Sequence, residues 1–75
     1  MKNTGFLDIE NKPILLGNEV EVYSMGHRIG FGEIVEVDNV PCVNHLGENI
    51  EYMIMNLDYL VHIKAIKVIN WNKDF

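Results

Sequence analysis

Apolar and polar residues alternate most clearly between residues 17 and 38. Residues 19–22 alternate glutamate with valine, and residues 35–38 alternate valine with an acidic side chain. A period of two is typical of a half-buried strand. Three glycines lie between the runs: Gly26, Gly30 and Gly32. Glycine reaches positive φ without a Cβ clash, and within a strand it usually marks a bulge or bend. We therefore predict a strongly bent hairpin with a turn at Gly26-His27 and a second strand over residues 33–38.

Weaker patterns predict short elements on either side of this hairpin. Residues 4–13 combine a short apolar piece with a polar turn that ends at Pro13. Residues 40–43 predict a third strand, and Pro41 favours an exposed sheet edge for it, because proline has no amide hydrogen to donate. Residues 44–49 predict a loop, since they are mostly polar and include a glycine.

The last third of the chain predicts two more strands. Residues 50–57 are largely apolar on both faces, which is typical of a central or doubly covered strand. Residues 65–70 return to a period of two, and Asp58 is suited to cap a short helical turn between the two strands. About five short strands with glycine turns predict an all-β fold, with one short helical turn as its only helical element. The expected architecture is a small SH3-like antiparallel barrel formed by residues 1–75 as one domain.

Length and composition set the class of protein. The chain has 75 residues, of which 48% are hydrophobic, so it can form a core but only a small one. No apolar run reaches the roughly 18 residues that span a bilayer, and residues 1–5 have no apolar signal-peptide segment. Cys42 is the only cysteine and cannot form an internal disulfide, which fits a reducing compartment. These features predict a cytoplasmic protein that makes no contact with membranes.

The charge disfavours binding to nucleic acid. The net charge is −5, and only six residues are lysine or arginine, whereas contact with a phosphate backbone needs clustered cations. A basic segment at the C-terminal end leaves one alternative open, a nucleic-acid-associated regulator. That segment would use Lys64, Lys67 and Lys73 together with Trp71.

Residues at both ends of the chain resemble the YopX family of phage proteins. The opening matches a pattern close to T-G-L-x-D-x-x-G-K-x-I-Y-x-G-D-I-V through Thr4-Gly5, Asp8, Asn11-Lys12, Ile14 and Gly17-Asn18-Glu19-Val20. The closing segment is similar through Leu57-Asp58-Tyr59-Leu60 and Lys67-Val68-Ile69-Asn70. The sequence departs from the family at Asn11, Asn18 and Asn70, where turn-forming Gly or Asp is usual. The resemblance implies a phage or prophage origin and an SH3-like barrel, and it implies no catalytic residues.

The sequence offers little catalytic or metal-binding chemistry. Cys42 and His45 have C-x-x-H spacing, and His27 and His62 lie elsewhere, but a zinc site normally needs two such close pairs. An apolar setting makes Cys42 an inert structural thiol rather than a nucleophile. The acidic residues near Glu33 are expected to face water. We therefore predict a protein that is not an enzyme and that uses no cofactor and no metal.

Two sets of residues are candidates for contacts with other molecules. The first is a partner-binding surface made of Met53, Met55, Tyr59 and Trp71, for which a position in the core is the alternative. The second is the hairpin tip, with His27 and Arg28. An exposed edge near residues 40–43 would also accept an added strand. The sequence thus predicts a non-enzymatic interaction module that binds a protein partner or a second copy of itself.

Overall fold

A computed structural model describes residues 2–47 and 52–70 of the chain. The elements follow one another as β1 (Asn3–Leu7), β2 (Pro13–Leu15), β3 (Glu19–Ser24), β4 (His27–Val37), β5 (Val40–Gly47), β6 (Tyr52–Asn56), α1 (Leu57–His62) and β7 (Ile66–Asn70). Strands dominate, and α1 is the single helix of the described residues, so the predicted all-β class is confirmed.

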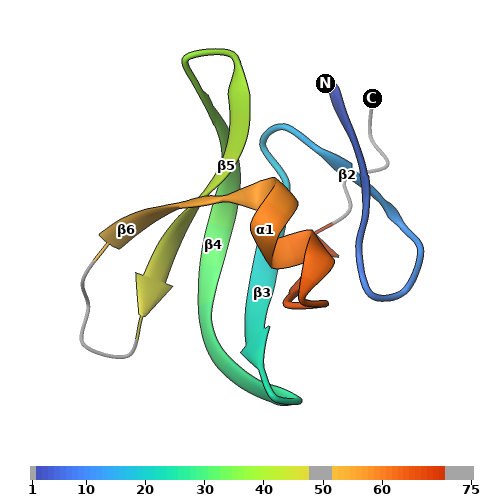
Figure 1. Cartoon of the computed structure of the whole chain (residues 1–75), viewed down its shortest axis with the longest axis vertical. Helices are drawn as coiled ribbons and strands as arrows, with labels where there is room; N and C mark the ends of the chain where they lie inside the picture. Colours follow the sequence, from blue (N-terminus) through green and yellow to red (C-terminus); the bar gives the residue numbers. More distant parts are fainter. Residues whose placement is uncertain (1, 48–51, 71–75) are drawn as a thin grey trace.

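The main sheet has five antiparallel strands in the order β6-β5-β4-β3-β7, and β1 and β2 form a second, two-stranded sheet. Strands β3 to β6 follow one another as neighbours. After α1 the chain returns to place β7 beside β3, at the opposite edge of the sheet from β6. This antiparallel order, with the long β4 curving through the molecule (Figure 1), agrees with the predicted small SH3-like arrangement.

The hairpin of residues 17–38 forms as predicted, but its turn lies one residue earlier. Met25 has a φ of 52° and Gly26 one of 82°. Two successive positive φ values belong to the tight turn that matches the twist of antiparallel strands. His27 therefore already belongs to β4, which is much longer than residues 33–38. The pairing register shifts between Val22 and Tyr23, beside the predicted bulge site in β4.

Gly30 and Gly32 allow β5 to pack closely on β4. A Cβ at Gly30 would lie 2.5 Å from both the His45 Nε2 and the Leu46 carbonyl oxygen, and one at Gly32 would lie 2.5 Å from the Val43 Cγ1. Real Cβ atoms do not approach other atoms so closely. The glycines thus leave room for the His45 and Val43 side chains on the core side of the sheet.

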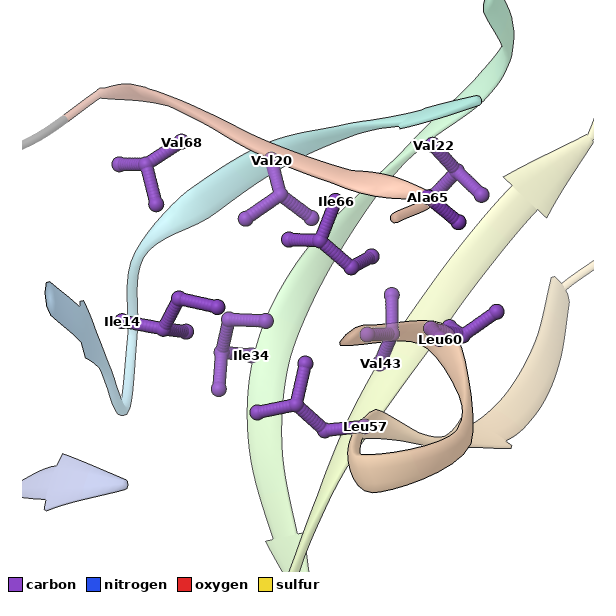
Figure 2. Close-up of a cluster of buried hydrophobic side chains, with 10 residues drawn as sticks. All are labelled: Ile14, Val20, Val22, Ile34, Val43, Leu57, Leu60, Ala65, Ile66 and Val68. Atoms are coloured by element: carbon purple, nitrogen blue, oxygen red, sulfur yellow. The ribbon is translucent and has the colours of Figure 1, made fainter. Parts of the chain in front are cut away.

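The core lies between the concave side of the main sheet, β2 and α1. Its buried members come from six elements or their flanks and point toward one another in Figure 2. They are Ile14, Val20, Val22, Ile34, Val43, Leu57, Leu60, Ala65, Ile66 and Val68. The helix contributes Leu57 and Leu60 from one face, whereas its Asp58 and Tyr59 side chains are exposed.

Asp8 fastens the β1–β2 hairpin to the last strand. Its Oδ1 accepts hydrogen bonds from the N–H groups of Glu10 and Lys12, both at 2.8 Å. Its Oδ2 accepts one from the Val68 N–H at 2.9 Å. The Ile9 N–H also donates to the Ile66 carbonyl oxygen at 3.0 Å. The side of β7 that faces away from β3 is thereby occupied by the β1–β2 connection.

Several predicted boundaries are wrong. Residues 44–47 continue β5 rather than forming a loop, and residues 48–49 lie outside the described part. The edge predicted near residues 40–43 is wrong from Cys42 onward, because β5 lies between β4 and β6 there, whereas residues 40–41 pair with β4 only. Pro41 is tolerated there since β6 pairs only with the residues from Cys42 onward. The residue that caps α1 is Asn56, whose side chain accepts a hydrogen bond from the Tyr59 N–H, and not Asp58.

Candidate interaction surface

The two edges of the main sheet differ. The outer side of β7 is occupied by Asp8 and Ile9, as described above. At the other edge, β6 pairs with β5 and with no further strand among residues 2–47 and 52–70. Residues 50–57 were predicted to be a central or doubly covered strand. Residues 50–51 lie outside the described part, and over residues 52–56 the prediction is wrong, because β6 is an edge strand with exposed side chains on both faces. Within the described part of the chain, the outer side of β6 thus has no strand paired with it, the arrangement that accepts an added strand.

The side chains of β6 make this edge apolar. Met53 is 58% exposed and Ile54 is 53% exposed, and the two point to opposite faces of the sheet. The strand sequence Y-M-I-M-N contains no charged residue and no proline, and its pairing with β5 shows no register shift. Natural edge strands commonly use a charged side chain, a proline or a bulge to prevent pairing with another chain, and residues 52–56 have none of these. We call residues 52–56 with Met53 and Ile54 the β6 edge.

The predicted partner-binding residues divide between this edge and other places. Met53 belongs to the β6 edge, whereas Met55 is half-buried and packs against the core, as the alternative prediction had it. Tyr59 is 62% exposed but is carried by α1. Trp71 lies outside the described residues. Ile54 was missed, although the absence of charge in the Y-M-I-M-N segment was a signal for it.

The hairpin-tip residues are both exposed, but Arg28 already has partners within the chain. Its Nη1 lies 3.1 Å from the Glu21 Oε2 in an ion pair, and its guanidinium carbon is 4.8 Å from the centre of the Phe31 ring. The Tyr23 hydroxyl donates a hydrogen bond to the same Glu21 carboxylate at 3.0 Å. Arg28 thus belongs to a small cluster on the outer face of the sheet, which is the face opposite the core.

This cluster shifts the pKa of two of its members in opposite directions. The hydrogen bond from Arg28 lowers the pKa of Glu21 because it favours the ionised carboxylate. The hydrogen bond that the Tyr23 hydroxyl donates to Glu21 raises the pKa of Tyr23, because the phenol loses this bond when it ionises.

The Glu21 shift predicts a pH dependence of stability. The usual pKa of the carboxyl is 4.5 and the folded value is lower, so the stabilisation is complete above pH 4.5 and is lost as the pH falls through the folded pKa. The difference in unfolding free energy between the wild type and Glu21→Gln should therefore shrink as the pH is lowered from 7 to about 3. Urea unfolding of both proteins across this range measures it, and a difference that stays constant with pH would contradict the assignment.

The outer face also carries a hollow of about 360 Å³ between β4 and β5. It is lined by Phe31, Gly32, Glu33, Asn44 and Leu46. Phe31 pairs with Leu46 across the two strands, and Glu33 pairs with Asn44. Neither Phe31 nor this hollow was found from the sequence, although the two glycines that flank Phe31 were a signal of close backbone packing there. We call this site the Phe31 hollow.

The C-x-x-H pair does not converge. Cys42 and His45 are three residues apart on β5, an odd spacing that directs the side chains to opposite faces of the sheet. Cys42 is buried and its thiol donates to the Val40 carbonyl oxygen at 3.5 Å. The His45 Nε2 is buried beside Gly30 without a hydrogen-bond partner. Within residues 2–47 and 52–70 no three His, Cys, Asp or Glu side chains are grouped to hold a metal ion.

The basic segment is only partly described. Lys67 lies on β7 opposite Glu21 of β3, so an acidic side chain faces it across the strands. Lys64 follows α1 with a φ of 58°, and Lys73 lies outside the described residues.

Comparison with known proteins adds no relative: no family model, no curated protein and no solved structure matches the chain. The resemblance to the YopX family therefore stays a prediction. In the described part of the chain, no helix has the length and apolar character needed to cross a membrane.

Proposed function

We propose that the chain is a non-enzymatic protein-interaction module that binds an extended segment along the β6 edge. The segment belongs to a partner protein or to a second copy of this chain. One observation carries the proposal: β6 is open and apolar on both faces, whereas β7 at the other edge is already occupied. An added strand would form main-chain hydrogen bonds with β6 and place its side chains beside Met53 and Ile54.

The energetics favour covering this edge. Burying a whole Met or Ile side chain contributes about 1.5–3 kcal/mol, so covering the exposed halves of Met53 and Ile54 would contribute about 1 kcal/mol each. Main-chain hydrogen bonds along a five-residue strand add to this and fix the register. The acidic net charge and the lone cysteine support a place in the cytoplasm, which would be that of the host cell if the protein is phage-encoded.

A charged residue on the β6 edge tests the proposal. Ile54→Lys introduces an edge-protecting charge at an exposed position, so the monomer fold should be retained. Ile69→Lys is the matched control, because Ile69 is also an exposed isoleucine but lies on β7. Sedimentation velocity over a range of concentrations should show self-association of the wild type and of Ile69→Lys that Ile54→Lys weakens by at least roughly tenfold.

If the wild type is a monomer, the same three proteins test binding to a partner. Each of the three proteins is used to capture binding partners from a host lysate. A captured protein supports the proposal only if it binds the wild type and Ile69→Lys and does not bind Ile54→Lys. A monomer with no Ile54-dependent partner contradicts the proposal. Tight, salt-sensitive binding to DNA or RNA would instead favour the nucleic-acid-associated regulator.

A further inference from the structure

The Phe31 hollow combines groups that suit a cation with an aliphatic stem. Phe31 and Leu46 face each other across β4 and β5 and form its apolar wall. Glu33 and Asn44, the next outward-facing pair along the same strands, supply a carboxylate and an amide. Pairs two residues apart on a strand lie about 6–7 Å from each other. The apolar wall and the acidic group are therefore within the reach of one long side chain.

The molecule already binds one guanidinium in this way. The Arg28 guanidinium lies 4.8 Å from the centre of the Phe31 ring and is paired with Glu21 at 3.1 Å. That contact is beside a second hollow, of about 190 Å³, on the side of Phe31 that faces the hairpin tip. Phe31 and Leu46 line both hollows. The Phe31 hollow repeats the combination of ring and carboxylate, with Glu33 in the place of Glu21.

Charge around Glu33 also favours a cation. Glu33 lies directly opposite Glu19 across β3 and β4, and like charges in this relation destabilise a sheet. Among residues 2–47 and 52–70, no basic side chain forms an ion pair with Glu33. A positively charged group in the hollow would be attracted by Glu33.

We propose that the Phe31 hollow binds the side chain of an arginine that belongs to a basic segment of another protein. The Glu33 carboxylate accepts hydrogen bonds from the guanidinium, the Asn44 side-chain oxygen accepts another, and Phe31 and Leu46 contact the aliphatic stem. A volume of about 360 Å³ and an apolar wall suit this side chain rather than a bare metal ion. The hollow adjoins the β6 edge, because Asn44 pairs with Ile54, but the groups proposed to hold the arginine belong to β4 and β5 and need no strand added to β6.

Small ligands test the hollow directly. The probes are the tripeptide acetyl-Gly-Arg-Gly-amide, its analogue with citrulline, which has the same shape without the charge, and free arginine amide. Titration followed by ¹⁵N–¹H NMR should give saturable shifts at the amides of Phe31, Glu33 and Asn44 with the arginine tripeptide, at millimolar concentrations. The citrulline tripeptide should bind at least roughly tenfold more weakly, because a charged hydrogen bond is stronger than a neutral one.

Two variants that each remove one negative charge distinguish binding at the Phe31 hollow from a general attraction to the acidic protein. Glu33→Gln should weaken binding of the arginine tripeptide by roughly tenfold. Asp58→Asn removes the same charge from an exposed position of α1 and should leave binding of the tripeptide unchanged. Tighter binding of the tripeptide than of arginine amide identifies a protein segment as the ligand, and tighter binding of arginine amide overturns that part of the proposal. The site itself is overturned if the arginine tripeptide gives no saturable shifts or if the citrulline tripeptide binds equally well. It is also overturned if Glu33→Gln and Asp58→Asn change binding of the arginine tripeptide equally. Because Ile54 pairs with Asn44, arginine binding is measured on the wild type. Binding of the arginine tripeptide to the wild type, together with no effect of Ile54→Lys on self-association or partner capture, would refute only the β6 edge.

Discussion

Asp8→Ala is expected to lower the free energy of unfolding by about 3–5 kcal/mol. Asp8 is 6% exposed, and its carboxylate accepts three hydrogen bonds, from the backbone N–H groups of Glu10, Lys12 and Val68. Each buried donor left without an acceptor costs about 1–3 kcal/mol, and water reaches part of this turn and reduces the total. Loss of the carboxylate also releases the β1–β2 connection from β7.

Urea unfolding measures this effect, with two further variants as comparisons. Asp8→Asn keeps the shape and one acceptor oxygen, so it should cost about 1–3 kcal/mol and report on the carboxylate even if Asp8→Ala does not fold. Glu10→Ala changes an exposed neighbour and should stay within about 0.5 kcal/mol of the wild type. Hydrogen exchange at the Val68 amide should accelerate in both Asp8 variants. An Asp8→Ala protein as stable as the wild type would show that the hydrogen bonds of the Asp8 carboxylate are not needed for stability.

Ile34→Ala is expected to cost about 2–5 kcal/mol. Ile34 is 1% exposed and lies in the middle of β4, where its side chain points into the cluster that Leu57 of α1 also enters (Figure 2). Removing three carbons there loses their burial and leaves a cavity, because packed neighbours close it only in part. In a chain of this length, such a loss is a large fraction of the total stability.

Graded substitutions separate a cavity from a general loss of strand propensity. Ile34→Val removes one carbon and should cost about 0.5–1.5 kcal/mol. Ile54→Ala, at an exposed position of β6, should cost about 1 kcal/mol or less. Thermal and urea unfolding at low protein concentration give all three values. Equal costs at Ile34 and Ile54 would mean that the cluster does not form the core.

The sequence predicts the local elements well, because their signals are local. The valine and glutamate alternation of residues 19–22 specifies β3, and the glycine at position 26 marks its turn within one residue. The strand predicted over residues 65–70 and the short helical turn before it are both present. Each of these depends on residues only a few positions apart.

The missed features depend on distant partners. Residues 44–47 look like a loop, but Gly30 and Gly32 of β4 give His45 room to extend β5. An apolar pattern on both faces is the same for a central strand and for an unprotected edge, so only the pairing shows that β6 is an edge. The role of Asp8 could not be seen either, because its bond to Val68 spans 60 residues.

The candidate surfaces show the same division between local and distant signals. Met53 and Tyr59 were candidates because methionine and tyrosine are common at interaction surfaces, with the core as the alternative, and both are exposed in the structure. The Phe31 hollow was not found, since it exists only through the register that sets Phe31 against Leu46 and Glu33 against Asn44.

The hydrogen bonds of Asp8 and Ile9 to β7 also determine how many further chains can add a strand to the main sheet. A sheet with two open edges can add a chain at each and grow without limit, whereas a sheet with one open edge accepts a single added strand. Because the β1–β2 connection occupies β7, pairing of two copies through β6 consumes the available edge on both and closes the assembly at a dimer. Under this proposal, the hairpin of residues 3–15 limits the main sheet to one added strand.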